Sequence, residues 1–489
     1  MSELLKKANK YEKEMIDKIH KDQRPVFHFS APVGWMNDPN GFSMFQDEYH
    51  LFYQYNPYNT HWDSMHWGHA KSKDFIRWEY LPAALAPDQD YDNFGVFSGG
   101  AIEANGKQYL MYTGVEEKRL PNGSKQIRQM QCLAVGDGVS YEKVQSNPVI
   151  TADMLPEGSS LEDFRDPKLW KEDDTYYVVA GSRHQDGSGQ IALFSSENLY
   201  DWKFCTILAH SANQLGKMWE CPDFFPLDGQ RILLISPQDV QAEGLEMHNG
   251  NGNVFMLGTY DKDTMKYECT EIQSCDYGLD FYAAQTMETA DGRRVMIGWM
   301  QSWDNHMCPS GFLWSGMNTI PRELFMENGR VCQKPVHEIE QYRKNKVCYE
   351  SITLENDISL RGICGRSVDL LIELQEADYE IFEIRLAANE KNYSSIKYNR
   401  KENTITFDRT YSGYCRDVIS SRTMLVRDNG GKLSLRILLD RYSCEIFANN
   451  GEQAMTSLIF TPQDGTGIQF LVRGKVIASI CKYDIIITE

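Results

Sequence analysis

The sequence predicts an all-β protein, a five-bladed β-propeller followed by a C-terminal β-sandwich. A pattern of strand, polar turn and strand recurs five times at intervals of about 60 residues, and long helical periodicity is absent from the same region. A β-strand repeat of this length is typical of propeller blades with long loops. The 489 residues are also too many for one ordinary core, which favours two domains.

The N-terminal segment is the one part of the chain with helical character. It is charged, and Tyr11, Met15 and Ile19 fall on one stripe of a helix. It lacks the apolar core and the cleavage site of a signal peptide. We therefore expect a lead-in helix within residues 1–26 that packs on a propeller domain of residues 27–337.

The five copies of the repeat each contain a polar turn followed by apolar and aromatic residues; they are residues 47–53, 106–112, 173–179, 229–235 and 292–298. Before each turn stands one side chain in a comparable position: Asp38, Ser98, Asp166, Glu220 and Tyr282. If the five copies of the repeat are aligned in the same phase, these residues lie on the innermost strands of successive blades. Their side chains then meet at one mouth of the central channel of the propeller. Three of them are carboxylic acids, which packing explains poorly because buried like charges repel each other.

The segment Trp35-Met36-Asn37-Asp38-Pro39-Asn40-Gly41 contains the first of these acids. Proline restrains the residue before it to an extended conformation, so Asp38 is held stiffly just before the strand that we expect from residue 41. An Asx-type turn at the surface is the alternative interpretation.

The repeat ends before residue 338. Residues 338–346 are expected to form a charged linker, and residues 347–489 show the short alternating strands of a β-sandwich. Within this region Asn450-Gly451 predicts a tight hairpin. We see no catalytic cluster in the sandwich.

Composition excludes several classes of partner. The net charge of −19 opposes binding to nucleic acid or to an anionic membrane, and no run of about 18 apolar residues could span a bilayer. The 12 cysteines are scattered without a C-x-x-C pair, which predicts reduced thiols in a cytoplasmic protein. Whether the chain forms a homo-oligomer stays open.

Three converging carboxylates suit two kinds of chemistry, a divalent metal site or glycoside cleavage. Arg165 would compete with a cation at Asp166, whereas it would hold that aspartate ionised, so we expect no metal and no cofactor. Cys221 is interpreted either as a residue that tunes Glu220 or as a small packed side chain. Six tryptophans suit stacking on sugars, although about half could be core residues: Trp35, Trp62, Trp67, Trp219, Trp299 and Trp303.

The motifs together resemble those of glycoside hydrolase family 32, the β-fructofuranosidases, which include invertases, inulinases and sucrose-6-phosphate hydrolases. They are residues 35–41, Arg165-Asp166-Pro167 and Glu220-Cys221-Pro222, supported by residues 52–57, 67–69, 97–99 and 281–283. The resemblance implies Asp38 as nucleophile, Glu220 as general acid/base and Asp166 as transition-state stabiliser. It also implies a set of sugar contacts: Asn37, Gln54, Trp62, Phe97, Ser98, Arg165, Tyr282 and Trp303.

The expected substrate is a small saccharide with a terminal β-linked fructose, namely sucrose or a short fructooligosaccharide. The second tryptophan of residues 298–304, Trp303, resembles the members of the family that cleave sucrose and fructans. A sucrose-6-phosphate hydrolase is the first alternative, with Arg119, Lys125, Arg128 or His306 as candidate phosphate contacts. A relative that binds fructosides without cleaving them is the second, and the presence of all three carboxylates opposes it.

Overall fold

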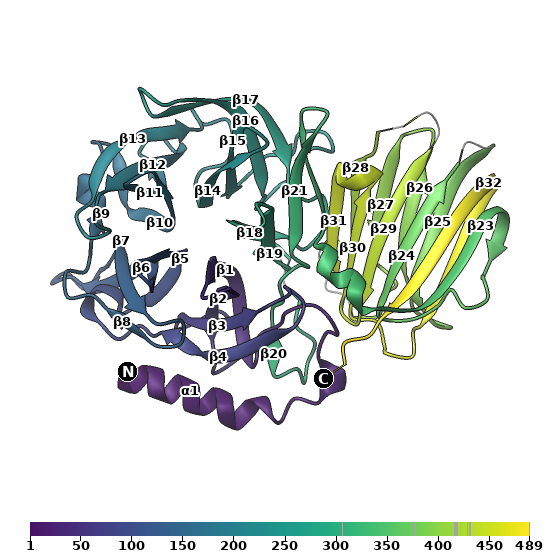
Figure 1. Cartoon of the computed structure of the whole chain (residues 1–489), viewed down its shortest axis with the longest axis horizontal. Coiled ribbons are helices and arrows are strands. Elements are labelled where there is room, and N and C mark those ends of the chain that lie inside the picture. The colour runs from purple at the N-terminus through teal and green to yellow at the C-terminus, as the bar shows by residue number, and fades with distance from the viewer. Residues whose placement is uncertain (306, 376–377, 415–418, 428, 430–431, 489) are drawn as a thin grey trace.

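The computed structural model describes all residues except 306, 376–377, 415–418, 428, 430–431 and 489. Five β-sheets surround a common centre, and one large folded sheet lies beside them (Figure 1). The prediction of a five-bladed propeller with a C-terminal sandwich is confirmed. No helix among the described residues has the length and apolar character needed to cross a membrane.

Each blade consists of antiparallel strands in sequence order from the centre outward. The strands of the first two blades are β1 (Gly34–Phe45), β2 (Glu48–Asn56), β3 (His66–Ser72) and β4 (Trp78–Leu85), then β5 (Gly95–Ala104), β6 (Lys107–Arg119), β7 (Lys125–Gly136), β8 (Tyr141–Lys143) and β9 (Ile150–Thr151). Those of the third and fourth are β10 (Ser159–Glu172), β11 (Thr175–His184), β12 (Gly189–Ser196) and β13 (Lys203–His210), then β14 (Trp219–Leu227), β15 (Gln230–Pro237), β16 (Val254–Asp261) and β17 (Lys266–Ser274).

The fifth blade closes the ring onto the first. Its strands are β18 (Tyr282–Glu288), β19 (Arg294–Trp299), β21 (Arg322–Glu327) and β22 (Arg330–Pro335). Between β19 and β21 the chain crosses to the first blade, where β20 (Trp314–Ser315) pairs in parallel with the start of β1. Closure thus ties two segments about 280 residues apart, which removes the free edge of β1.

The N-terminal helix α1 (Glu3–Ile16) lies along the outer edge of the first blade, beside β4 (Figure 1). Leu5 and Ala8 are buried against the blade, and Tyr11 and Met15 of the predicted stripe are half-buried. Ile19 is buried too, but it follows the end of the helix. Short 3-10 helices occur in the connections: η1 (Lys21–Gln23), η2 (Asp90–Asp92), η3 (Ala152–Met154), η4 (His337–Tyr342) and η5 (Asn449–Gly451).

The C-terminal region is one hydrogen-bonded sheet that folds over on itself, with the long strand β32 shared between its two halves. The first half of β32 pairs with β25 and the second half with β24, while β23 runs along its other edge. The strands are β23 (Arg343–Ile358), β24 (Val368–Leu374), β25 (Tyr379–Ala388), β26 (Ser394–Asn399), β27 (Thr404–Asp408), β28 (Ser421–Leu425), β29 (Leu433–Asp440), β30 (Ser443–Ala448), β31 (Gln453–Leu458) and β32 (Gly467–Ile485).

Two details of this region differ from the sequence prediction. The hairpin expected at Asn450-Gly451 is present between β30 and β31, but it has four connecting residues, from Asn449 to Glu452, and η5 with its three positive φ angles lies within them. Cys348 and Cys481 form a disulfide rather than remaining reduced. The two cysteines are direct partners in the β23–β32 register, with Cα atoms 4.2 Å apart, although 133 positions separate them in the chain.

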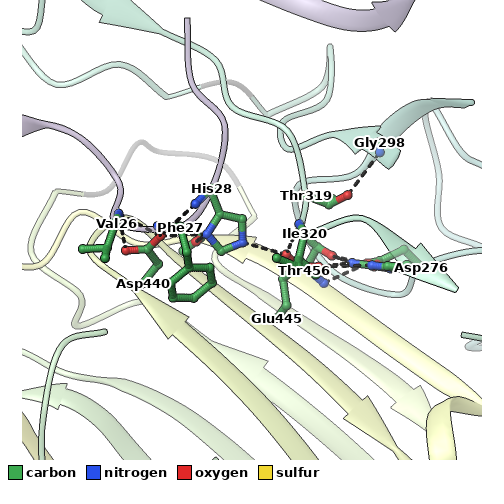
Figure 2. A network of polar contacts seen from close by, with 12 residues as sticks. Val26, Phe27, His28, Asp276, Gly298, Thr319, Ile320, Asp440, Glu445 and Thr456 are labelled. Atoms are coloured by element: carbon green, nitrogen blue, oxygen red, sulfur yellow. Dashed lines mark hydrogen bonds and ion pairs between the residues drawn. The ribbon is translucent and has the colours of Figure 1, made fainter. Parts of the chain in front are cut away.

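A buried network of charges joins the propeller to the sandwich (Figure 2). His28 lies between Asp440 Oδ2, 2.9 Å from its Nδ1, and Glu445 Oε1, 2.8 Å from its Nε2. Glu445 also binds Arg322 of β21, whose Nη1 donates to Asp276 at 2.9 Å. Burial alone would lower the pKa of His28, but the two carboxylates outweigh it and raise that pKa to about 9. The imidazolium is therefore part of the interface.

Candidate active site

Each innermost strand contains a β-bulge at or next to its predicted site residue. The register with the second strand of the blade shifts in five places: between Met36 and Pro39, Phe97 and Gly99, Arg165 and Lys168, Glu220 and Asp223, and Tyr282 and Gln285. A bulge breaks the alternation of side chains and re-aims one of them. These strands are the ones nearest the centre of the propeller (Figure 1), so the bulges direct five side chains towards one region.

The bulges also account for prolines inside strands. Pro39, Pro167 and Pro222 follow directly after Asp38, Asp166 and Cys221, within β1, β10 and β14. Proline cannot donate a ladder hydrogen bond and is confined to edge strands and bulges. Asp38 accordingly lies within a strand that begins at Gly34, rather than in a turn before it.

Both carboxyl oxygens of Asp38 accept hydrogen bonds from neighbouring side chains. Asn37 Nδ2 donates to Oδ1 at 3.0 Å, and Ser98 Oγ donates to Oδ2 at 2.7 Å. Asn37 is itself fixed by Trp35, whose Nε1 donates to Asn37 Oδ1 at 2.8 Å. Burial raises the pKa of Asp38 to about 6, against the effect of these donors and assisted by the charge of Glu220. The carboxyl group lines the cavity, and its pKa lies above the ordinary value of an aspartate.

Asp166 is the most buried of the three acids, with 5% of its surface exposed. The backbone N–H of Cys221 donates to its Oδ2 at 3.0 Å. The Cys221 sulfur lies 3.6 Å from Asp166 Oδ2 and 3.8 Å from Asp38 Oδ2, so Cys221 bridges the two aspartates and does not act on Glu220. Burial and three neighbouring carboxyl groups raise the pKa of the thiol, which stays protonated and can donate its one S–H to either aspartate.

Glu220 has different partners. Arg165 Nε donates to its Oε1 at 2.9 Å, and Tyr282 Oη donates to its Oε2 at 2.6 Å. Arg165 was expected to hold Asp166 ionised; its guanidinium instead binds Glu220, Asp163 and Gln129. Burial, with the charge of Glu220, raises the pKa of Asp166 to about 7, although Arg165 opposes this shift through its charge. A metal ion at Glu220 would have to displace the arginine, which disfavours the metal interpretation.

A cavity of about 450 Å3 is lined by the three carboxyl groups. Seven of the eight expected sugar contacts line it: Asn37, Gln54, Trp62, Phe97, Ser98, Arg165 and Trp303. Tyr282 is the exception, because it is 1% exposed and lies behind Glu220, where it positions that carboxyl group. Of the six tryptophans, Trp62 and Trp303 face the cavity and the other four are buried core residues.

Sequence reasoning missed five residues of the lining: Ile127, Gln129, Glu162, Asp163 and Gln238. Glu162 and Asp163 precede the Arg165-Asp166 motif on β10, and this adjacency is a signal that could have identified them. Ile127 and Gln129 lie on β7, a third strand of its blade, and Gln238 follows β15. No motif marks these positions, since only the packing of neighbouring blades brings them to the cavity.

Comparison with known proteins identifies this constellation. Residues 28–335 match the N-terminal domain of glycosyl hydrolases family 32, and residues 338–484 match the C-terminal domain of the same family. The chain belongs to glycoside hydrolase family 32. This family 32 protein is therefore a glycoside hydrolase, and the resemblance inferred from its motifs is confirmed.

Individual relatives of this family 32 hydrolase differ in the substrate that their names give. It is 37% identical to a sucrose-6-phosphate hydrolase of Escherichia coli over 89% of each chain, and 36% identical to a raffinose invertase of Escherichia coli over 90% of each. Among solved structures, a β-fructofuranosidase of Bombyx mori superposes with a TM-score of 0.85 at 32% identity, covering 98% of this chain and 97% of that one.

Proposed function

We propose that this hydrolase releases terminal β-linked fructose from sucrose and short fructooligosaccharides with retention of configuration, through a fructosyl-enzyme intermediate. The observation that carries the proposal is the set of three carboxyl groups in one cavity, each held by different donors. Different partners allow different protonation states, and a retaining glycosidase needs one ionised and one protonated carboxyl group.

In the first step, Asp38 attacks the anomeric C2 of fructose while Glu220 donates its proton to the leaving oxygen, and the bond between C2 and that oxygen breaks. Ser98 and Asn37 hold the two oxygens of Asp38 during the attack. In the second step, Glu220 removes a proton from water, and the hydroxide attacks C2 and releases Asp38 as a carboxylate. Asp166 accepts hydrogen bonds from fructose hydroxyls that strengthen as positive charge develops.

Two variants and one trapping reaction test these roles. Asp38→Asn and Glu220→Gln should each lower kcat by several orders of magnitude with an unchanged Tm or a higher one. Cleavage of sucrose in aqueous methanol should give methyl β-fructoside, since methanol attacks the covalent intermediate from the same face as water. Formation of the α-anomer would contradict a covalent intermediate at Asp38.

The charge of the lining favours substrates without phosphate. Five acidic residues line the cavity: Asp38, Glu162, Asp163, Asp166 and Glu220. Among the described lining positions, Arg165 is the one basic residue. Arg165 is already bound to Glu220, Asp163 and Gln129. Of the candidate phosphate contacts, Lys125 pairs with Glu117, neither Arg119 nor Arg128 lines the cavity, and His306 lies outside the described residues. A phosphate dianion would meet repulsion here.

Because several relatives are named for sucrose-6-phosphate, the competing substrate needs a direct measurement. We expect kcat/KM for sucrose to exceed that for sucrose-6-phosphate. A tenfold preference for the phosphorylated sugar would assign the enzyme to the other branch of its family.

A cytoplasmic location is likewise proposed, on the basis of nine free cysteines among the described residues, and cell fractionation tests it.

A further inference from the structure

A patch of three aromatic rings forms part of the cavity rim. Trp62 is 40% exposed and Phe94 is 38% exposed, while Phe97 is half-buried beneath them. The ring centroids of Trp62 and Phe97 are 5.8 Å apart, and the Phe94 centroid is 6.3 Å from each. Trp62 and Phe97 line the cavity, whereas Phe94 packs against both rings and is not among the lining residues. The patch therefore continues the wall of the cavity onto the outer surface.

Both segments that carry the exposed rings are held in place. Phe94 N donates to Val115 O at 3.0 Å, and the neighbouring Asn93 accepts from Glu117 N at 2.9 Å, so this loop is fixed to β6. The Trp62 loop is fixed by Asn56, whose Nδ2 donates to His61 O at 2.9 Å. Exposed aromatic side chains on a rigid frame lose little conformational entropy when a ligand covers them.

The chemistry of the patch suits the face of a sugar ring. Contiguous exposed apolar surface next to a pocket marks a place where a ligand lies. A pyranose or furanose ring has an apolar face of C–H groups that packs on an aromatic ring, and its hydroxyl groups remain in water. The position of Phe94 beyond the lining of the cavity indicates a ring further from the scissile bond than the two rings of sucrose.

We propose that Phe94 and the outward side of Trp62 form an outer subsite for the third sugar ring of a fructooligosaccharide. This inference rests on the proposed cleavage of terminal fructose. The first ring occupies the carboxyl end of the cavity, the second lies at the level of Phe97 and Trp62, and the third covers Phe94. Sucrose, with two rings, does not reach Phe94.

The test compares substrates of two, three and four rings in the Phe94→Ala variant. We expect kcat/KM for 1-kestose and nystose to fall roughly five- to tenfold, as for the loss of about 1 kcal/mol of aromatic contact, while the value for sucrose stays within about twofold of wild type. Phe94→Tyr should retain the activity on 1-kestose, because it keeps the ring. The matched control is Tyr200→Ala, an aromatic residue that is also 38% exposed but lies in the turn between β12 and β13.

Equal losses on sucrose and 1-kestose would overturn the inference, since they would mean that Phe94 acts by supporting Trp62. Unchanged kinetics on all three substrates would overturn it as well. If the wild-type enzyme cleaves sucrose, the proposed function stands whichever result the variant gives. If the wild-type enzyme cleaves none of these fructosides, the proposed function fails first.

Discussion

Single hydrogen bonds differentiate the acids of this cavity. Asp38 accepts from a serine and an asparagine, Asp166 from a backbone N–H, and Glu220 from an arginine and a tyrosine. The sequence placed these acids at comparable positions of a repeat, but it could not assign their partners. Except for Asn37, the partners come from neighbouring blades, and their identity depends on side-chain direction at each bulge.

Replacing Ser98 should change the pH dependence of the enzyme. Burial raises the pKa of Asp38 to about 6, and this value already includes the lowering effect of the hydrogen bond from Ser98. Ser98→Ala should therefore move the acidic limb of kcat/KM upward by roughly 0.7 of a pH unit, since such a bond contributes about 1 kcal/mol and one pKa unit corresponds to about 1.4 kcal/mol. The pH profile of sucrose hydrolysis measures this.

A suitable control for that experiment is Ser43→Ala. Ser43 is a buried serine of β1 whose hydroxyl donates to Gly41 O, away from Asp38. The pH profile of kcat/KM for the Ser43→Ala variant should have the same acidic limb as that of the wild type. If the acidic limb of the pH profile is unchanged in the Ser98 variant, the ionisation of Asp38 does not determine that limb.

The ionised side chain of Asp166 should lower the free energy of unfolding at high pH. Its pKa is raised from 3.8 to about 7 in the folded protein, so folding favours the protonated form. This contribution is fully present below pH 4 and is lost as the pH rises through 7. Asp166→Asn should therefore be inactive but should have a higher Tm than wild type at pH 8, and the difference should vanish near pH 4. A lower Tm for the variant at every pH would contradict the assignment.

At the scale of elements, the blade repeat was predictable and the bulges were not. Polar turns followed by aromatic strands located β2, β6, β11, β15 and β19, because a propeller repeats one local pattern. Pro39 was interpreted as a residue that stiffens Asp38 before a strand, whereas Pro39, Pro167 and Pro222 all lie at bulges within strands. A strand interrupted by proline looks like a turn from local sequence alone.

Helix α1, which lies outside both family domains, should support the Trp62 loop. Tyr11 Oη donates to Tyr58 O at 3.3 Å, and the two rings pack edge to face at 5.3 Å. Tyr11→Ala should loosen this loop and raise KM for sucrose roughly threefold or more, while kcat stays within about twofold because the acids lie on other strands. Steady-state kinetics test the split, with the exposed Lys13→Ala on the same helix as control. A fall in kcat alone would contradict this role.

At the scale of the whole molecule, the buried interface ties the two domains by charge. His28 is positively charged between Asp440 and Glu445, with a folded pKa of about 9 against 6.5 when unperturbed. Since the folded pKa is the higher one, its stabilisation is complete below pH 6.5 and is lost as the pH rises through 9. The interface between the propeller and the sandwich should therefore become less stable in alkaline solution.

The variant His28→Gln tests this expectation. It leaves the buried Asp440 without its cation and removes one of the two cations that pair with Glu445, a change that costs about 3 kcal/mol or more, so its Tm at pH 7 should be several degrees below wild type. The gap should shrink between pH 7 and pH 10, as the wild-type imidazolium loses its proton. Differential scanning calorimetry of both proteins, with His20→Gln as an exposed control, measures it. A constant gap across this range would show that the charge of His28 does not matter.

The sequence by itself determined the architecture and grouped the three acids for which we propose catalytic roles. A propeller repeats its local pattern, and side chains in the same phase of each copy must converge at the centre of the ring, so Asp38, Asp166 and Glu220 could be grouped without coordinates. Tertiary structure alone decided the partner of Arg165, the bridge made by Cys221, the Cys348–Cys481 disulfide and the network around His28. Each of these joins residues from different blades, different domains or distant strands, and the spatial registration of such segments leaves no local pattern in the chain.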